Sequence, residues 1–428
     1  MKQIGLILFI SLCISGLYGQ KITPQDVLST AVKDSRVLRN QQITSFTQGL
    51  KYHIPFVKQV EARLGINGSA LGDTIYGYIR NEDFYGVQVG FNSFREIKQQ
   101  KLMKQAQIGL YQSEARVLEQ QALSDRYQSL VFWAFSQQLL TGRRELEILF
   151  NKKHDILRLM IEKGLDVKVK DVMDTEEDKN SVQLSILSLE EAIILQKNKI
   201  KQFLDYPSLP ELNTINFITI EKILEVINNS KINPLNHPAI GYKNAKTAFS
   251  TSQLNYVNSQ NRQILNMARL GYENPLYLER PKNFNTFNNI SFRIGLTVPL
   301  TGNNNFKHSE ALLEQKEAQN EVDILREQLA RNVDNQYVKL ESLINRYQLC
   351  VEKIQQSLIQ KMLKNEKLLS QMSPLEVVDL QLTQQKLSLR ADELSHDIVS
   401  EYVKLLELTG KMSEKPLLNY LSATLENL

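Results

Sequence analysis

The chain has 428 residues, of which 42% are hydrophobic and 23% charged, and its formal net charge is +4. This balance, without a run of basic residues, argues against a protein that binds nucleic acid. After the first 19 residues, no segment approaches the roughly 18 to 20 consecutive apolar residues of a membrane helix. A soluble exported protein and a membrane protein built from strands both remain compatible with this composition.

Residues 1–19 have the pattern of a cleaved secretory signal. Lys2 precedes an apolar run from Ile4 to Ile14, and small and polar residues then end at Gly19 and Gln20. Cys13 follows Leu12 instead of the small residue that normally precedes a lipidated cysteine, which favours an unlipidated product. Cleavage leaves only Cys350, so we expect no disulfide within the exported chain.

Short words recur in the same order about half a chain apart. Ala62–Gly65, Ala-Arg-Leu-Gly, returns unchanged at Ala268–Gly271, and Asp171-Val-Met-Asp174 is matched by Glu376-Val-Val-Asp379. This predicts a unit of about 200 residues used twice. The predicted divisions are a signal peptide at 1–19, a first repeat at 20–206, a connector at 207–237, a second repeat at 238–410 and a tail at 411–428. We expect the connector to be a small mixed region wrapped on the helices.

Each repeat holds two segments in which apolar and polar residues alternate strictly, the pattern of a strand with two unlike faces. The segments are Val60–Asn67, Tyr85–Asn92, Ala268–Glu273 and Ile290–Val298, joined by Gly68–Asp83 and Asn274–Asn288. Alternation alone favours a soluble, half-buried sheet. Strand lengths of about 10 residues favour a membrane strand instead, as do aromatic residues in the joining segments. These aromatic residues are Tyr76, Tyr78, Tyr277, Phe284 and Phe287.

Most of the remaining sequence predicts helix. Phe94–Lys163 and Phe306–Gln371 contain no proline, and each predicts a helix of roughly 100 Å that packs as a coiled coil. A second helix is predicted to run back after each, at Asp174–Leu204 and Pro374–Gly410. The apolar seam of the second long helix is predicted to contain Ala311, Gln315, Ala318, Val322, Leu325, Leu329, Val333, Tyr337, Leu340, Ile344, Tyr347, Val351, Ile354 and Leu358.

Four strands are too few to close a barrel with a lumen. If they lie in lipid, their edges must be paired, because an open edge leaves backbone groups without hydrogen bonds in hydrocarbon. Several copies must then share one barrel. The strand count alone allows two chains, three chains or more.

This arrangement resembles the TolC-like outer-membrane efflux protein family over nearly the whole mature chain. The resemblance depends on the twofold order of elements and on three motifs: Gly295-Leu-Thr-Val-Pro-Leu300, Ser373-Pro-Leu-Glu-Val-Val-Asp379 and Leu405-Leu-Glu-Leu-Thr-Gly410. It implies a mainly α fold in a homotrimer, with a shared twelve-stranded barrel in the outer membrane of a Gram-negative bacterium. Long coiled-coil helices continue that barrel as a tunnel in the periplasm.

The resemblance also implies a function, which is passive conduction in a tripartite efflux or type I secretion system. The implied partners are outer-membrane lipid, a periplasmic adaptor (membrane fusion) protein and an inner-membrane transporter, with no nucleic acid. A non-enzymatic periplasmic helical scaffold or adaptor is the alternative. No catalytic or phosphate-binding motif occurs, and the five histidines show no metal-ligand spacing. The sequence therefore predicts no enzyme, no cofactor and no metal site.

Three sets of residues are predicted to be functional. The resemblance places an acidic ring at the periplasmic gate, but Asp171 and Glu376 have an alternative role, since each can lie in the first turn of a return helix and favour its dipole. Arg63 and Arg269 can tune selectivity in the lumen or pair with Glu61 and Glu273. The gate residues are Asp171, Asp174, Glu376 and Asp379; the barrel-lumen residues are Glu61, Arg63, Gln88, Arg269 and Arg293; the adaptor-docking residues are Gly164, Leu165, Ser373 and Pro374.

Overall fold

The computed structural model describes residues 22–50, 55–70, 79–206, 217–229, 236–261, 265–276, 290–296 and 302–428. The predicted signal peptide and the five aromatic residues predicted at the strand ends lie outside these ranges. The chain forms two compact units. The helical unit comprises Met1–Arg39, Ala115–Ile240 and Leu325–Leu428, and the strand unit comprises Asn40–Glu114 and Gly241–Ile324.

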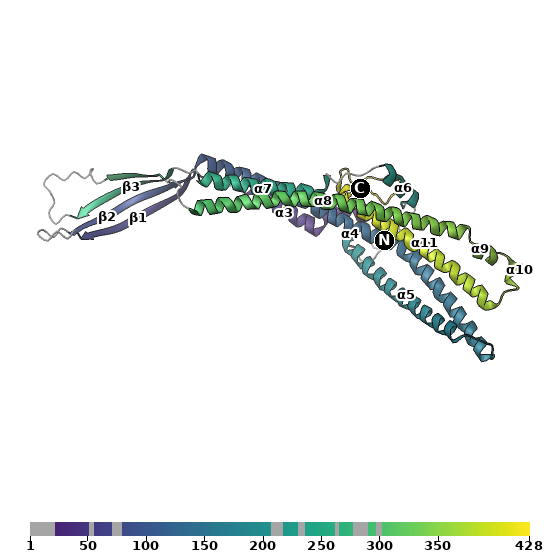
Figure 1. Cartoon of the computed structure of the whole chain (residues 1–428). Coiled ribbons are helices and arrows are strands. Elements are labelled where there is room, and N and C mark those ends of the chain that lie inside the picture. The colour runs from purple at the N-terminus through teal and green to yellow at the C-terminus, as the bar shows by residue number, and fades with distance from the viewer. Residues whose placement is uncertain are drawn as a thin grey trace, which may run out of the picture. The chain divides into compact units, whose positions relative to one another are not determined.

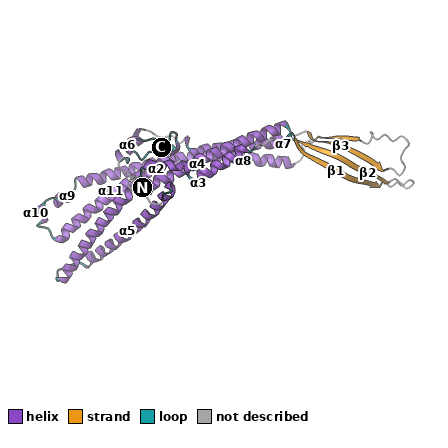
Figure 2. Cartoon of the chain, turned by 180° about the vertical axis from the view of Figure 1, so that it is seen from behind, coloured by secondary structure: helices purple, strands orange, loops and turns teal. Residues whose placement is uncertain are grey.

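Helices dominate the structure, as the sequence predicts (Figures 1 and 2). The α-helices are α2 (Pro24–Ser29), α3 (Ser35–Gly49), α4 (Phe94–Glu162), α5 (Val169–Leu204), α6 (Ile220–Asn229), α7 (Pro238–Asn261), α8 (Gly302–Gln355), α9 (Leu358–Leu363), α10 (Glu366–Leu369) and α11 (Pro374–Leu408). Short 3-10 helices lie at Thr30–Lys33 and Lys411–Ser413. In both halves a helix, two strands, a long helix and a return helix follow one another.

The strands of the strand unit form one antiparallel sheet in the order β1-β2-β3-β4. They are β1 (Val57–Ala70), β2 (Ile79–Phe91), β3 (Leu265–Leu276) and β4 (Ile290–Leu296). All four predicted strands are therefore present. The predicted joining segment Gly68–Asp83 was too long, because ladder pairing between β1 and β2 continues to Ala70 and Ile79. The pair β2–β3 joins strands from opposite halves of the sequence.

The first long helix is confirmed, since α4 runs from Phe94 to Glu162. The second was predicted to reach Gln371, and this was wrong, because α8 ends at Gln355 and the short helices α9 and α10 follow. The Ser357 side chain accepts a hydrogen bond from the backbone N–H of Gln360, and Asn365 accepts from Lys367 and Leu368. Such side-chain caps compete with a continuous helix. Leu358, predicted on the seam, is consequently exposed.

Both return helices are confirmed, although α5 begins at Val169, five residues before the predicted start. Helix α11 begins at Pro374 after a complete capping box, in which Ser373 and Glu376 satisfy each other's backbone N–H groups. Proline at the first helical position costs nothing, because that N–H has no partner within the helix.

The core of the helical unit lies between α4, α8 and α11, and the predicted seam of α8 forms one wall of it. Leu340 and Ile344 of α8 pack in one cluster with Ile398, Tyr402 and Leu405 of α11. Each side chain buried in this way contributes roughly 1.5–3 kcal/mol to stability. Leu329 and Val333 are further buried seam residues of this unit, and Ala311, Ala318 and Val322 are buried in the part of α8 that belongs to the strand unit.

A buried carboxylate on α11 ties the same two helices together. Glu401 accepts hydrogen bonds from the Gln336 amide at 2.7 Å and from Lys339 Nζ at 2.9 Å, both on α8, and from Lys404 at 2.8 Å. Burial alone would raise the pKa of this carboxyl, but the three donors outweigh it and hold the pKa at about 2. Glu401 is therefore ionised inside the core.

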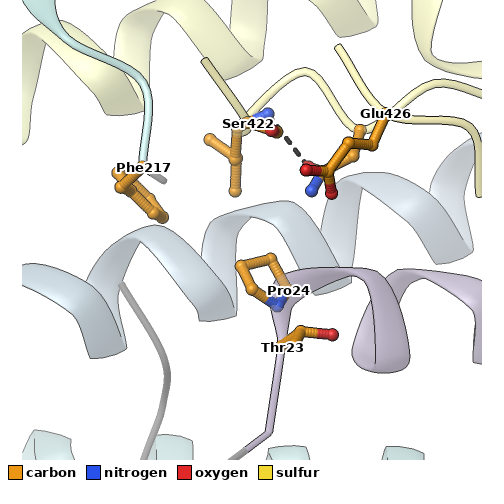
Figure 3. Close-up of a pocket in the computed structure, with 7 residues that line it drawn as sticks. Thr23, Pro24, Phe217, Ser422 and Glu426 are labelled. Carbon is orange, nitrogen blue, oxygen red and sulfur yellow. Dashed lines mark hydrogen bonds between the residues drawn. The ribbon is translucent and has the colours of Figure 1, made fainter. Parts of the chain in front are cut away.

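Residues 411–428 are part of this core. The hydroxyl of Tyr127 on α4 donates to the Leu418 carbonyl at 2.8 Å and accepts from the Tyr420 N–H at 3.2 Å. The Leu421 carbonyl accepts from the backbone N–H of Ile218, in the connector, at 2.8 Å. A cavity of about 60 Å³ lies at this junction, where Thr23 and Pro24 face Ser422 and Glu426 (Figure 3). Residues 217–229 of the predicted connector and the tail thus pack on the helices.

None of the helices in the described ranges carries an apolar stretch that would span a lipid bilayer.

Candidate functional site

One row of the sheet contains four of the five predicted lumen residues. Glu61 on β1 is opposite Gln88 on β2, Gln88 is opposite Arg269 on β3, and Arg269 is opposite Arg293 on β4. Paired residues on neighbouring strands point to the same face of a sheet. The structure therefore brings these side chains to one face, in a line across all four strands.

Arg63, the fifth predicted lumen residue, lies in the adjacent row of that face, with Gly86, Gly271 and Ser291. Its guanidinium forms an ion pair of 3.0 Å with Glu61, which is the pairing that the sequence offered as an alternative to a selective role. The corresponding pairing of Arg269 involves the Glu273 side chain, which lies outside the described residues. The polar face therefore has a charged row beside a row that contains Arg63 and three small residues.

The opposite face of the sheet is apolar and exposed. Leu64 is 78% exposed, Phe292 64% and Ile294 54%, although side chains of this size are normally buried in a soluble protein. The exposed apolar residues of the strands come from all four of them, and they include Val60, Leu64, Tyr85, Val87, Leu270, Tyr272, Ile290, Phe292, Ile294 and Leu296. Nothing in the described part of the strand unit covers this apolar face.

The predicted gate carboxylates lie at the start of α5 and α11. Asp171 is in the first turn of α5, where its backbone carbonyl accepts from the Thr175 hydroxyl at 2.6 Å, and Asp174 is exposed one turn on. Glu376 accepts from the Ser373 N–H at 2.8 Å and from the Ser373 hydroxyl at 2.9 Å. These bonds lower the pKa of the Glu376 carboxyl. Both Asp171 and Glu376 therefore occupy the helix-start positions that the sequence gave as their alternative role.

Asp379 behaves differently from the other three. Its carboxylate forms an ion pair of 2.8 Å with Lys153 of α4, which lies 226 positions away in the sequence. No sequence pattern indicates this pair. A second ion pair, between Lys386 of α11 and Asp178 of α5, measures 2.9 Å. Among the described contacts, none joins Asp171 or Asp174 to Glu376 or Asp379. The structure of one chain thus places the four carboxylates at two helix starts and does not bring them into one cluster.

The predicted docking residues also lie at these two turns. Gly164 follows the end of α4 and has a φ of +69°, a left-handed conformation that glycine adopts without strain. Leu165 beside it is 54% exposed. Ser373 and Pro374 begin α11 through the capping box and are also exposed. An exposed apolar side chain at a helix turn is available for contact with another protein.

In the described residues, no group of three or more His, Cys, Asp or Glu side chains is arranged to hold a metal ion. Cys350 is buried in an apolar cluster with Ala391 and Leu394, and its thiol donates a hydrogen bond of 3.5 Å to the Leu387 carbonyl. Burial raises the pKa of this thiol, which keeps it protonated.

No protein-family model matches the chain, and no curated protein matches it significantly by sequence. Solved structures match it by fold. CusC, whose crystal structures follow folding and transmembrane channel formation, matches with a TM-score of 0.62 and 13% identity, over 92% of this chain and 93% of CusC.

Two further matches extend this likeness. The outer membrane protein VceC from Vibrio cholerae has a TM-score of 0.60 and 14% identity, over 90% of this chain and 96% of VceC. The open state of the MtrE outer membrane channel from Neisseria gonorrhoeae has a TM-score of 0.61 and 11% identity, over 90% of this chain and 88% of MtrE. The chain thus has the fold of outer-membrane channel proteins, which confirms the TolC-like resemblance at the level of the fold.

Proposed function

We propose that the protein is an outer-membrane channel that conducts substrates passively out of a Gram-negative cell. The observation that carries this proposal is the sheet, which has an uncovered apolar face on one side and a row of charged and polar residues on the other. Lipid covers the apolar face, and the row Glu61, Gln88, Arg269 and Arg293 lines a water-filled lumen together with Arg63.

The number of strands supports a trimer. Among the described residues, β1 and β4 each pair on one side only, and neither edge can stay open in hydrocarbon. Two copies would form about eight strands, and side chains fill the interior of a barrel of that size. Three copies give about twelve strands, which leaves room for a passage. In this proposal the helices of the three copies continue the passage as a tunnel in the periplasm.

The fold also supports a place in a tripartite efflux or type I secretion system, because MtrE is an outer membrane channel with the same fold. An inner-membrane transporter would supply the energy and a periplasmic adaptor would join it to this protein. We propose that the adaptor docks at the two helix turns, where Leu165 is exposed at one turn and Ser373 and Pro374 are exposed at the other. In the assembled protein, copies of Asp171, Asp174, Glu376 and Asp379 would surround the tunnel entrance.

The ion pair between Lys153 and Asp379 suggests how that entrance is held. It joins α4 to the first part of α11 within one chain, so breaking it frees this first part of α11 to move. Asp379→Asn should therefore increase single-channel conductance in planar bilayers. Glu327→Gln is a matched control, since Glu327 is an exposed carboxylate of α8 whose ion-pair partner Arg331 lies on the same helix. Equal conductance in both variants and in the unchanged protein would remove the gate proposal.

The channel proposal itself has a separate test. Purified protein should be extracted only with detergent and should insert into planar bilayers as a conducting oligomer. The alternative function, a periplasmic helical scaffold or adaptor, requires recovery from the soluble periplasm without detergent. A stable, water-soluble monomer that gives no conductance would contradict the channel.

A further inference from the structure

A cavity of about 330 Å³ lies in the helical unit, and none of its lining residues belongs to the two helix turns described above. Its walls come from α4, α8 and α11 and from the stretch Phe217–Glu221 that leads into α6. Cavities of roughly 300–1,000 Å³ are the size that holds small molecules. The proposed channel function assigns no role to this cavity.

Three aromatic side chains form the apolar walls of the cavity together with Ala134, Ile218 and Ile220. Phe135 of α4 meets Phe217 edge to face, with ring centroids 6.0 Å apart, and Tyr347 of α8 adds a third ring to the lining. His396 of α11 supports Phe135 from another side, with centroids 5.8 Å apart in a near-perpendicular arrangement. Phe135 is therefore held between two rings, and its orientation does not depend on a ligand.

The polar groups of the cavity are acidic or neutral. Glu221 lines it with an exposed carboxylate, and Gln138 lines it with an amide that donates to Asp392 at 2.6 Å. No lysine, arginine or histidine is among the described residues that line the cavity. The nearest basic residue in sequence, Lys222, is directed to Glu225 at 2.7 Å.

The local charge is accordingly negative. Burial raises the pKa of the Tyr347 hydroxyl, and the carboxylates of Glu221 and Asp392 raise it further. Burial likewise raises the pKa of Asp392, with smaller contributions from Glu145 and Glu393. In the described residues, neither Glu221 nor Asp392 has a cationic side chain within ion-pair distance. A bound cation would supply the missing counter-charge.

We propose that this cavity binds a small organic cation with an aromatic or alkyl body, such as a substituted ammonium ion. The aromatic walls would cover the apolar body, and the faces of aromatic rings attract a cation. Glu221, which lines the cavity, and Asp392, which accepts a hydrogen bond from the lining residue Gln138, would neutralise its charge. The inference does not depend on the proposed channel function, since it concerns a cavity within the helical unit of one chain.

The test is isothermal titration of the purified, detergent-solubilised full chain with benzyltrimethylammonium. We expect saturable binding of one ion per chain, and weak or no binding of benzyl alcohol and benzoate at the same concentrations. Glu221→Gln and Asp392→Asn should each weaken binding by about fivefold or more, because each removes one charge with little change of shape. Glu327→Gln is the control, since Glu327 is an exposed carboxylate of α8 outside the lining whose ion-pair partner Arg331 lies on the same helix.

Three results would overturn the proposal. The first is the absence of saturable binding of benzyltrimethylammonium to the unchanged protein. The second is binding of benzyl alcohol with equal affinity, which would mean that the cavity recognises an aromatic body and not a cation. The third is an equal effect of Glu327→Gln and Glu221→Gln. Channel conductance remains a separate measurement, so either proposal can fail without the other.

Discussion

The seam of α8 and the outer face of the sheet are both apolar, but their surroundings differ. Leu340 and Ile344 on the seam are 0% and 1% exposed, because α11 supplies the side chains that cover them. Leu64 and Phe292 on the sheet are 78% and 64% exposed. An apolar pattern therefore indicates that a surface must be covered, but not what covers it. For the seam the cover is the same chain, and for the sheet we propose lipid.

The charged groups show the same contrast. Glu401 is buried and held by Gln336, Lys339 and Lys404, whereas the pair of Glu61 and Arg63 lies on a half-exposed face. Ion pairs that are exposed to water contribute little to stability, and buried carboxylates depend strongly on their donors. The stability of the helical unit should therefore respond to changes of charged residues and of pH that leave the stability of the sheet unaffected.

The largest effect should follow from a charge placed in the seam. Ile344→Asp puts a carboxylate where no donor is available, and we expect a loss of more than about 4 kcal/mol, enough to prevent folding of the helical unit. Val338→Asp is the control, because Val338 lies on the same helix and is 67% exposed. Circular dichroism melting in detergent distinguishes them, and equal melting temperatures would show that the seam is not a core.

A charge on the outer face of the sheet should act only in a membrane. Ile294→Arg should oppose membrane insertion by roughly 2–4 kcal/mol if the residue lies near the centre of the bilayer. Its melting temperature in detergent should change little. Ser291→Arg changes the opposite face of the same strand and should insert normally. Normal insertion of Ile294→Arg, measured by fractionation of cell envelopes, would contradict a lipid-facing sheet.

Acid should weaken the helical unit through Glu401. The pKa of its carboxyl is lowered from 4.5 to about 2 in the folded protein, so the stabilisation is complete above pH 4.5 and is lost as the pH falls toward 2. We expect a loss of about 2–3 kcal/mol over this range. Chemical denaturation at pH 5 and pH 3 measures it. A Glu401→Gln variant with the same pH dependence as the unchanged protein would show that Glu401 is not the responsible group.

The smallest effect on stability should come from the exposed pair on the polar face. Glu61→Gln removes a 3.0 Å ion pair with Arg63 and should cost less than about 1 kcal/mol. It also removes the carboxylate of the charged row, so the remaining arginines should shift ion preference toward anions in planar bilayers. Lys58→Gln, also on β1, is a control for an unspecific effect of lost charge. An unchanged reversal potential in Glu61→Gln would place the row outside the conducting path.

Local patterns in the sequence predicted the elements and their faces well. The alternation around Val60 and Ile290 predicted four strands because a strand places successive residues on opposite faces. The spacing of Leu340 and Ile344 predicted a buried seam for the corresponding reason in helices. Ser373 and Glu376 have the Ser-x-x-Glu spacing of a capping box. This spacing supports the helix-start alternative for Glu376.

Contacts between distant residues could not be predicted in this way. The sequence repeat suggests that Arg63 and Arg269 have equivalent neighbours, but Arg63 is opposite Gly86 while Arg269 is opposite Arg293, so the two hairpins differ in register. Lys153 and Asp379 meet only because α4 and α11 pack together. The cavity beside Phe135 combines side chains from four separate segments, none of which contains a motif. Such features depend on packing, which no local pattern encodes.

The contact of Tyr127 with Leu418 and Tyr420 has a consequence for the order of folding. These residues are separated by about 290 positions, yet the tyrosine hydroxyl is buried against them. While the chain is synthesised, Tyr127 is present long before its partners, and its hydroxyl must stay hydrated until they arrive. Closure of the helical unit around this contact is therefore a late event in the folding of the chain.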